Sequence, residues 1–464
     1  MGQPNKPVTG SPALKRLLNE SEAAAEYGDG SMLHLMAKAL FENSTSTRTY
    51  AIPVSQNALE PATWKITLSP NRGVKNIPAS VAIMGQDIGF IIPENLANQS
   101  PLDVLCQRIK ADQSLPVEAK LDREKDTGKG PITSLTLTAK AKGLPAKSLS
   151  ILPSSDLINV TSTDGSGTMD LSEVKKTIYN KQFHLIVCPY YNDATVAAMA
   201  PDLEERFSIK RQIEGQMITA VSGTMDEIKT QCSSKHITAL ALGTGSPTPH
   251  YVWAAALCGV IAESAQIDPA RPFNTLPLRG CIPPPDEQRL ERAQRAAFLD
   301  AGYSTYNVGF GGEPSIERLI TMYKNDRAPA DESYLSLNTL LTLSFLRRSG
   351  TIHLKINGTL YSAKGGFKYN LGVPKNEAIL DASGQAIGYK SLPQVAYFEG
   401  EIYDSRDIDL KLLCSLDDGT ATLELANGKT IILRNCWYAG TGEGQTEEGT
   451  IVFRLEGRSA EESK

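Results

Sequence analysis

Hydrophobic and polar positions change their spacing once along this chain, near Arg347 and Arg348. Before that point, apolar stretches with helical spacing alternate with short β-rich runs, which predicts a parallel sheet covered by helices. After it, residues 351–455 show an alternation of period two, as in the run 420–425, where Thr, Thr and Glu alternate with Ala, Leu and Leu. The pattern therefore predicts an α/β fold followed by an all-β fold.

Asn-Gly pairs mark the expected turns of the second part. Asn357-Gly358 and Asn427-Gly428 each lie between two β-rich runs. A type I′ turn needs positive φ at both central residues, and Asn-Gly tolerates this best. Each pair therefore predicts a β-hairpin.

Residues 1–62 predict two helices and a strand. The first helix is expected to begin at Ser11 with Pro12 at its first position, and to end at Tyr27-Gly28. The second is expected to begin at Ser31, with a strand at Thr47–Val54 after it. A strand ahead of the first helix would complete a βαβ unit, and we expect that strand to be missing because the chain opens almost directly on the loop.

Residues 63–151 predict a small α+β domain inserted into the α/β fold. Its elements are expected to be strands at Trp64–Leu68, Ser80–Ile92, Pro116–Leu121 and Ile132–Ala139, with a helix at Pro101–Asp112. The charged, glycine-bearing stretch 122–130 predicts a loop or a hairpin tip.

The α/β pattern resumes at about Leu171 and continues to residue 346. Nearly all residues of 184–188 and 239–242 are apolar, as in strands that helices cover on both faces. The predicted strands are Phe183–Cys188, Gln216–Val221, Ile237–Gly243 and Ser304–Val308. The predicted helices are Ala194–Glu214, Asp226–Ser233, Tyr251–Ala265, Asp286–Ala301, Ser315–Lys324 and Tyr334–Leu346. The chain is thus expected to hold four regions, 1–62, 63–151, 171–346 and 350–464.

Composition indicates an ordinary folded protein, with 464 residues, 41% hydrophobic content and a net charge of -5. No apolar run approaches the roughly 20 residues that span a bilayer. The amino end lacks the apolar core of a secretory signal, so we expect the chain to start out in a cytoplasm. Residues 351–464 carry 12 Lys and Arg against 16 Asp and Glu. Neither part has the clustered basic face that binds nucleic acid.

Cysteine and histidine predict neither a disulfide framework nor a metal site. The seven cysteines form no CxxC pair and are interpreted as buried thiols. No two histidines have the spacing of three or four residues that a helical metal pair requires. The five are His34, His184, His236, His250 and His353. No cofactor and no metal are expected.

Two glycine clusters are the strongest candidates for ligand loops. Gly243-Thr244-Gly245-Ser246-Pro247 follows a predicted strand, where backbone amides can hold an anion. It matches no phosphate-loop motif, and a tight turn into the next helix is the favoured interpretation. Gly309-Phe310-Gly311-Gly312 is interpreted as a permissive crossover into a helix after Pro314.

Weaker motifs leave no catalytic, cofactor-binding or metal-binding residue assigned. Ser222 with His184 or His250 and Asp202 can be drawn as a hydrolase triad, but no G-x-S-x-G motif is near and His184 lies within an apolar strand. The stretch 164–170 lacks the spacing of an EF-hand and is interpreted as a flexible linker. The row Arg289, Arg292 and Arg295 is interpreted as a solvated helix face.

Longer runs carry a family resemblance. In the first part they are Tyr27–Ala39, Tyr50–Val54, Ile186–Tyr190, Arg211–Gly215, Pro272–Leu278 and Tyr334–Thr339. With these runs, residues 1–346 resemble the tail sheath protein of Mu-like contractile-tail phages. In the second part the runs are Gly365–Phe367, Phe398–Asp404, Thr422–Lys429 and Glu447–Gly449. This part resembles the tail tube protein of the same phages, so the chain looks like a fusion of two tail proteins.

The resemblance implies a subtilisin-like α/β core without catalytic serine chemistry, followed by a β-barrel or sandwich. It implies a virion tail protein, assembled in the host cytoplasm, that forms stacked six-fold rings with sheath, tube and baseplate proteins. Contraction of such a sheath drives the tube through the host envelope. DNA would pass an acidic lumen without being bound.

Both ends of the family's sheath are expected to be missing from this chain. Family sheaths begin upstream of Met1 and continue past the Tyr334 helix into a part that lends a strand to a neighbour. We therefore expect exposed apolar surface near Tyr334–Leu346. The alternative is an α/β enzyme, a hydrolase or a nucleotide-binding protein, with a β-rich accessory module. A ligand in the Gly243 loop would support that alternative.

Overall fold

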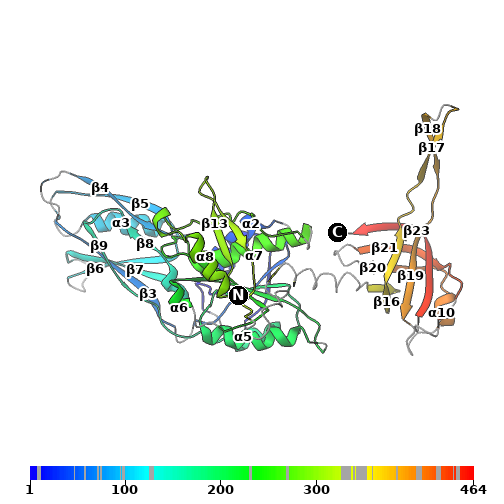
Figure 1. Ribbon diagram of the computed structural model, residues 1–464, viewed down its shortest axis with the longest axis horizontal. Helices are drawn as coiled ribbons and strands as arrows, with labels where there is room; N and C mark the ends of the chain where they lie inside the picture. The colour runs from blue at the N-terminus through cyan, green and yellow to red at the C-terminus, as the bar shows by residue number, and fades with distance from the viewer. Residues whose placement is uncertain are drawn as a thin grey trace. The chain divides into compact units, whose positions relative to one another are not determined.

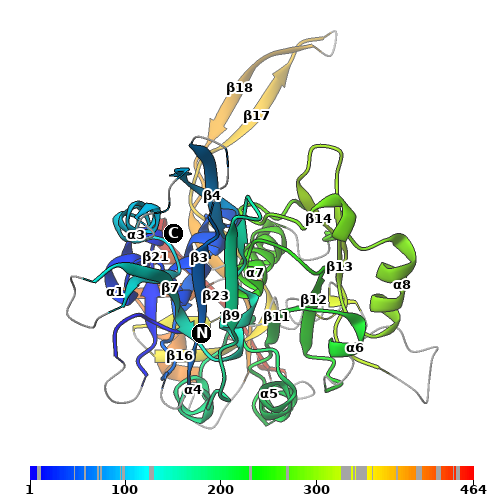
Figure 2. The same ribbon diagram turned by 90° about the vertical axis from the view of Figure 1, so that its left-hand side faces the viewer.

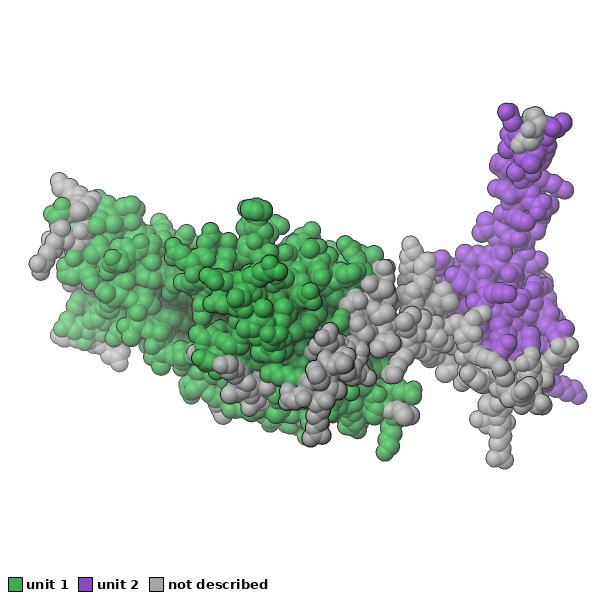
Figure 3. Space-filling model, viewed as in Figure 1, with its two compact units in different colours: residues 1–341 green, residues 342–464 purple. Residues whose placement is uncertain are grey.

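The protein is described by a computed structural model. The described residues are 1–7, 12–45, 47–56, 59–70, 73, 76–94, 96, 100–124, 130–208, 210–228, 232–267, 271–324, 336–337, 340, 353–357, 359–382, 385–403, 410–424, 430–442, 444–445 and 450–463. The chain separates into two compact units, residues 1–341 and 342–464 (Figure 3). The predicted boundary at Arg347 and Arg348 lies outside the described residues.

The first predicted helix is wrong at its start. Lys15–Leu17 form strand β1, which pairs in antiparallel fashion with β2 (Thr49–Ala51). Helix α1 (Glu20–Tyr27) begins only after Asn19, whose side chain accepts a hydrogen bond from the Glu22 amide. Asn19 is a strong helix cap, and the pairing with β2 outweighs the helical spacing of the leucines before it. The end of this helix and the start of α2 (Met32–Asn43) are as predicted.

A strand-like segment does precede α1, contrary to expectation. Gly2 pairs in parallel with Pro53, donating a hydrogen bond to the Ile52 carbonyl and accepting one from the Val54 amide. With α1 and α2 between them, these segments make a short βαβ unit.

Residues 61–163, here called the inserted region, form two antiparallel sheets with a common core. The elements are β3 (Pro61–Leu68), β4 (Ile77–Ile83), β5 (Gln86–Ile92), α3 (Pro101–Ala111), β6 (Val117–Arg123), β7 (Ile132–Lys142), a 3₁₀ helix (Leu144–Ser148), β8 (Ile151–Pro153) and β9 (Ile158–Thr163). The sheet orders are β6-β7-β3-β9 and β5-β4-β8. Apolar side chains of both sheets and of α3 share one cluster, as Ile66, Val81 and Leu105 show.

Two features of this region differ from the sequence prediction. The single strand expected at Ser80–Ile92 is a hairpin, because the chain turns at Met84 and Gly85, which have positive φ. Strands β8 and β9 were not predicted. The loop or hairpin tip expected at 122–130 lies partly outside the described residues.

A parallel sheet with helices around it forms the α/β core. Its elements are α4 (Ser172–Ile178), β10 (Leu185–Val187), α5 (Asp193–Arg206), β11 (Gln216–Ser222), α6 (Met225–Ile228), β12 (Ile237–Leu242), α7 (His250–Ile267), α8 (Arg292–Asp300), β13 (Thr305–Val308) and β14 (Pro314–Arg318). Strands β10, β11 and β12 are parallel neighbours, and β11 and β12 lie side by side in Figure 2. A parallel bridge from Leu240 to Ser304 places the start of β13 beside β12. The predicted parallel sheet is confirmed.

Several predicted helices of the core end or begin elsewhere. The helix expected at Ser315–Lys324 is wrong. Strand β14 lies there instead; buried residues alternate with more exposed ones along it, and the strand pairs with β13. Helix α5 ends at Arg206, and Glu291 caps α8, which breaks the long helix expected from Asp286. Helix α4 was not predicted.

The leucine-rich helix expected at Tyr334–Leu346 lies mostly outside the described residues. Its described leucines, Leu337 and Leu340, are buried. At these two positions the expected apolar surface is therefore not exposed.

The second unit is β-rich, as predicted. Its elements are β15 (His353–Ile356), β16 (Thr359–Asn370), β17 (Lys375–Leu380), β18 (Ala386–Leu392), β19 (Ala396–Tyr403), α10 (Leu410–Cys414), β20 (Gly419–Glu424), β21 (Thr430–Tyr438), β22 (Gly444–Gln445) and β23 (Thr450–Ser463). A curled antiparallel sheet has the order β19-β16-β15-β20-β21-β23-β22, and β19 also pairs with β23 (Figure 1). Its concave side holds one apolar cluster that includes Phe398, Leu423 and Phe453.

The predicted hairpin is confirmed at the first Asn-Gly pair. Ile356 pairs with Thr359 across it, and Asn357 has a φ of 48°. The Asn357 side chain also accepts a hydrogen bond of 2.9 Å from the Thr420 amide. The second pair, Asn427-Gly428, lies outside the described residues.

Candidate functional site

The Gly243 loop is a packed turn between β12 and α7. A Cβ on Gly245 would lie 1.6 Å from the Gln288 side-chain oxygen, so the segment around Gln288 covers the loop. Ser246 accepts a hydrogen bond of 3.1 Å from the Trp253 indole and lies 3.0 Å from the Ile282 carbonyl, to which it donates. The chain itself therefore fills the space in which an anion would lie against these amides.

The residues of the drawn hydrolase triad have other partners. Asp202 pairs with Arg206 at 3.0 Å and with Arg211 at 3.3 Å. His250 is buried, with Nε2 2.6 Å from the Pro189 carbonyl and Nδ1 2.7 Å from the Ser148 hydroxyl. Burial lowers the pKa of His250 to about 4. These contacts join elements of the fold and leave neither group poised for acid–base catalysis.

The remaining sequence motifs are structural as well. Gly309–Gly312 forms the turn of the β13–β14 hairpin, where Phe310 is exposed. Ser166, within the expected flexible linker, exchanges backbone hydrogen bonds with Glu60. The row of arginines is only partly solvated, since Arg295 is paired with Glu317 at 2.8 Å and is mostly buried. Within the described chain, no group of three His, Cys, Asp or Glu side chains could hold a metal ion.

The expectation of seven buried thiols is wrong at two positions. Five cysteines are buried, whereas Cys232 is half-buried and Cys414 is exposed. Burial raises the pKa of the Cys188 thiol to about 11, so this group stays protonated at neutral pH. All seven cysteines are free.

A projecting hairpin is the most conspicuous surface of the second unit. Strands β17 and β18, here called the arm, pair only with each other among the described strands and extend away from the curled sheet (Figure 1). Nearly every described side chain of the arm is exposed. Large apolar residues are among them, with exposed fractions of 60% at Leu380, 68% at Ile387 and 68% at Tyr389.

The register of the arm gathers its charged side chains on one face, which also carries Ile379 and Leu392. Glu377 pairs with Lys390, and Lys375 forms an ion pair of 2.9 Å with Glu377 on the same face. Tyr389 pairs with Ala378 on the opposite face. An isolated two-stranded hairpin is marginally stable in water, and an exposed apolar ribbon gains free energy when a partner covers it.

A ladder of charges lies on the convex side of the curled sheet. The Arg454 guanidinium bonds Glu399 at 2.7 Å and Glu456 at 2.8 Å, and it lies 4.5 Å from the centre of the Tyr397 ring. The hydrogen bond with Glu456 is the main reason that the pKa of Arg454 is raised. Lys368 adds a contact of 4.0 Å with Glu399. This surface carries both signs of charge in close alternation.

Comparison with known families gives these surfaces a context. Residues 164–322 match the family described as phage tail sheath protein central domain, and residues 346–462 match phage tail tube protein. The chain joins a phage tail sheath domain to a phage tail tube domain. It is a structural protein of a contractile phage tail and not an enzyme.

Individual proteins are also similar to this chain. The Mu-like prophage FluMu tail sheath protein of Haemophilus influenzae is 28% identical over 343 residues, which cover 70% of this chain and 68% of that protein. Among solved structures, the sheath tail protein of Desulfitobacterium hafniense is 11% identical with a TM-score of 0.38, over 88% of this chain and 91% of that one. Hcp1 of Flavobacterium johnsoniae is 14% identical with a TM-score of 0.20, over 24% of this chain and 94% of that one.

Sequence reasoning recognised the tail families but missed the arm of the tube domain. The run 375–392 mixes charged, apolar and glycine residues without a clear period, so it predicted no element. Its signal was the presence of Ile379, Leu380, Ile387 and Tyr389 in a stretch otherwise too polar to be buried. No helix in the described part of the chain is both long enough and apolar enough to span a membrane.

Proposed function

We propose that the tube domain assembles into rings with other copies of this chain, and that the arm makes the contact between copies. The exposed apolar face of the arm carries this proposal. A soluble monomer rarely keeps Leu380, Ile387 and Tyr389 together in water on a ribbon that nothing covers. A second copy is the favoured partner, because tail tube proteins act as repeated subunits.

The finer architecture belongs to the same proposal. The curled sheet, in which β19 pairs with both β16 and β23, would be a tail-tube barrel. The α/β core at 171–346 would be a subtilisin-like sheath core, with 1–62 as its start and an inserted α+β domain whose β9 carries it beyond the expected end at residue 151. The subunits would form stacked six-fold rings in the host cytoplasm and join sheath, tube and baseplate proteins.

The lumen of such a tube would let DNA pass without binding it. The tube domain has more Asp and Glu than Lys and Arg, and Arg454 is held between Glu399 and Glu456. A surface whose cations are already paired offers few free charges to phosphates. Contraction of a surrounding sheath would drive this tube through the host envelope.

Assembly can be tested by light scattering after size-exclusion chromatography and by negative-stain electron microscopy. We expect rings from the wild-type chain and monomers from a Tyr389→Ser, Leu380→Ser double variant. Lys390→Ser is the matched control, because Lys390 neighbours Tyr389 but lies on the charged face. Rings from the double variant would exclude the arm as the contact, and monomers from the control would show that the loss of assembly is not specific to the apolar side chains.

A further inference from the structure

Two connections join the inserted region to the α/β core, and they cross at one point. Residues 55–60 lead into the inserted region, and residues 164–170 lead out of it. The Glu60 carbonyl accepts hydrogen bonds from the Gly143 amide at 2.9 Å and from the Ser166 amide at 3.2 Å. The Glu60 amide donates to the Ser166 carbonyl at 3.0 Å. Entry, exit and the end of β7 therefore share a single backbone crossing, here called the hinge.

Glycine makes this crossing both close and permissive. A Cβ on Gly165 would lie 2.5 Å from the Gly143 carbonyl oxygen, so no other residue fits there without a shift. Gly143 and Gly167 have φ values of 78° and 107°, which side chains rarely allow. Residues of this kind can change backbone angles with little steric resistance, as hinges require.

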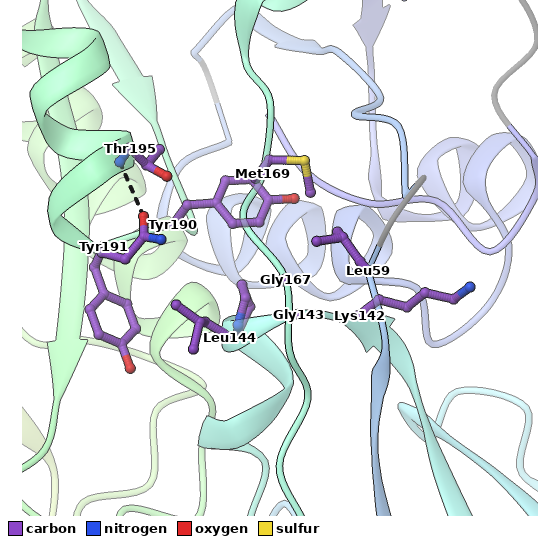
Figure 4. A pocket seen from close by; sticks show the side chains of 11 residues that line it. Leu59, Lys142, Gly143, Leu144, Gly167, Met169, Tyr190, Tyr191 and Thr195 are labelled. Carbon is purple, nitrogen blue, oxygen red and sulfur yellow. Dashed lines mark hydrogen bonds between the residues drawn. The ribbon is translucent and has the colours of Figure 1, made fainter.

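Two small spaces of about 10 and 120 Å³ lie beside the hinge, and both are lined by Met169 and Thr195; Figure 4 shows the first. The first is also lined by Leu59 and Gly143. The Thr195 hydroxyl is buried and has no hydrogen-bond partner among the described residues.

Polar contacts join the two parts across the junction. The inserted region and the α/β core have separate apolar clusters. Between them, the Gln3 side chain donates to the Lys142 carbonyl at 2.8 Å and accepts from its amide at 2.7 Å. Lys140 donates to the Asp29 carbonyl at 2.8 Å. Polar interfaces of this kind permit domains to move relative to each other.

His250 ties the two parts together at the centre of the junction. It is the first residue of α7, and Ser148 lies in the 3₁₀ helix of the inserted region. Because a carbonyl can only accept, Nε2 carries the proton toward Pro189, and Nδ1 faces the Ser148 hydroxyl. The ring thus links the segment that follows β10, helix α7 and the inserted region through two short hydrogen bonds.

We propose that the inserted region swings about the hinge at Glu60, Gly143 and Ser166, and that the contact between His250 and Ser148 latches it in the position seen here. A sheath subunit with this hinge and latch could change its shape without disturbing the parallel sheet. The proposal rests on the first unit alone and does not depend on ring assembly by the tube domain.

Hydrogen exchange of the full-length chain, followed by mass spectrometry, tests the hinge. Amides at 140–148 and 164–170 should exchange at least roughly tenfold faster than those of β3 and β11, which lie in the two cores. These exchange rates are compared within the wild-type chain, so this test needs no variant. Equal protection of the hinge and both cores would overturn the proposal, because the first unit would then open only as a whole.

The latch is tested by Ser148→Ala, which removes the hydroxyl but keeps the backbone. Exchange at the hinge should rise roughly threefold while β3 and β11 stay unchanged. Ser134→Ala is the matched control, since its buried hydroxyl donates to Asp122 at 2.7 Å within the inserted region and far from the latch in the chain. An unchanged hinge in the first variant, or an equal rise in the control, would exclude the latch.

Discussion

Arg206 shows what a single residue does to hold the sheath domain together. Its side chain is fully buried, and it donates to Asp202 and to the carbonyls of Ile178 and Lys181. Helix α5 is thereby fixed to the end of α4. A buried charge is tolerated only while all of its partners remain, so this network is sensitive to the loss of one carboxylate.

We expect Asp202→Ala to lower the free energy of unfolding of the first unit by about 3–5 kcal/mol, because it leaves two guanidinium groups without their shared carboxylate. Urea titration followed by tryptophan fluorescence measures this change. Glu205→Ala is the control, because Glu205 contacts Arg211 at 3.4 Å but is mostly exposed. Its effect should stay below about 1 kcal/mol. Equal effects of both substitutions would contradict this account.

Two buried histidines predict a loss of stability in acid. Burial lowers the pKa of His236 and of His250 to about 4. Between an ordinary pKa of about 6.5 and this value, the unfolded chain binds protons that the folded chain does not. Stability is therefore complete above pH 6.5 and falls toward pH 4, by roughly 2 kcal/mol for each histidine between pH 7 and 4.5.

Urea titrations at several pH values check this slope. His236→Gln and His250→Gln should each remove about half of the histidine contribution. His236 stacks on Phe207 with 3.9 Å between ring centres, so its variant is also expected to be less stable at every pH. If neither variant changes how steeply the free energy of unfolding falls with pH, carboxylates and not these histidines cause the acid sensitivity.

At the scale of elements, the sequence predicted those whose hydrophobic period was long and clear. Strands β11 and β12, whose residues are nearly all buried, were found from their apolar runs, and α2 was found from its cap at Ser31. Short elements gave mixed results, because three to five residues fit either period; β2, β10 and β13 were predicted as strands. Strand β1 and strand β14 were both predicted as helices, and in each case pairing with a distant or neighbouring strand decided the outcome.

The turn between β15 and β16 predicts a local stability effect. Asn357→Ala places a Cβ-bearing residue without a polar side chain at positive φ and removes the hydrogen bond to Thr420. We expect the tube domain to lose about 1–2 kcal/mol. Asn376→Ala, on the exposed arm, should change stability by less than about 0.5 kcal/mol. Chemical denaturation of both variants measures the difference, and equal losses would show that this turn has no special role.

At the scale of the whole molecule, resemblance was more informative than pattern. The spacing of residues alone predicted an α/β part and a β-rich part. It predicted no metal site, but it left an enzyme as the alternative function. The runs around Tyr27–Ala39 and Phe398–Asp404 indicated the two tail families that the comparisons then matched. The candidate contact surface could not be predicted, because an apolar arm exposed to solvent has no periodic signature in the sequence.

Electron microscopy of the purified full-length chain tests the central claim most directly. We predict rings or stacked tubes at micromolar concentration, with loss of these particles in the Tyr389→Ser, Leu380→Ser variant and their retention in Lys390→Ser. A chain that stays monomeric at every concentration, while folded by circular dichroism, would contradict the claim that its tube domain assembles through the arm.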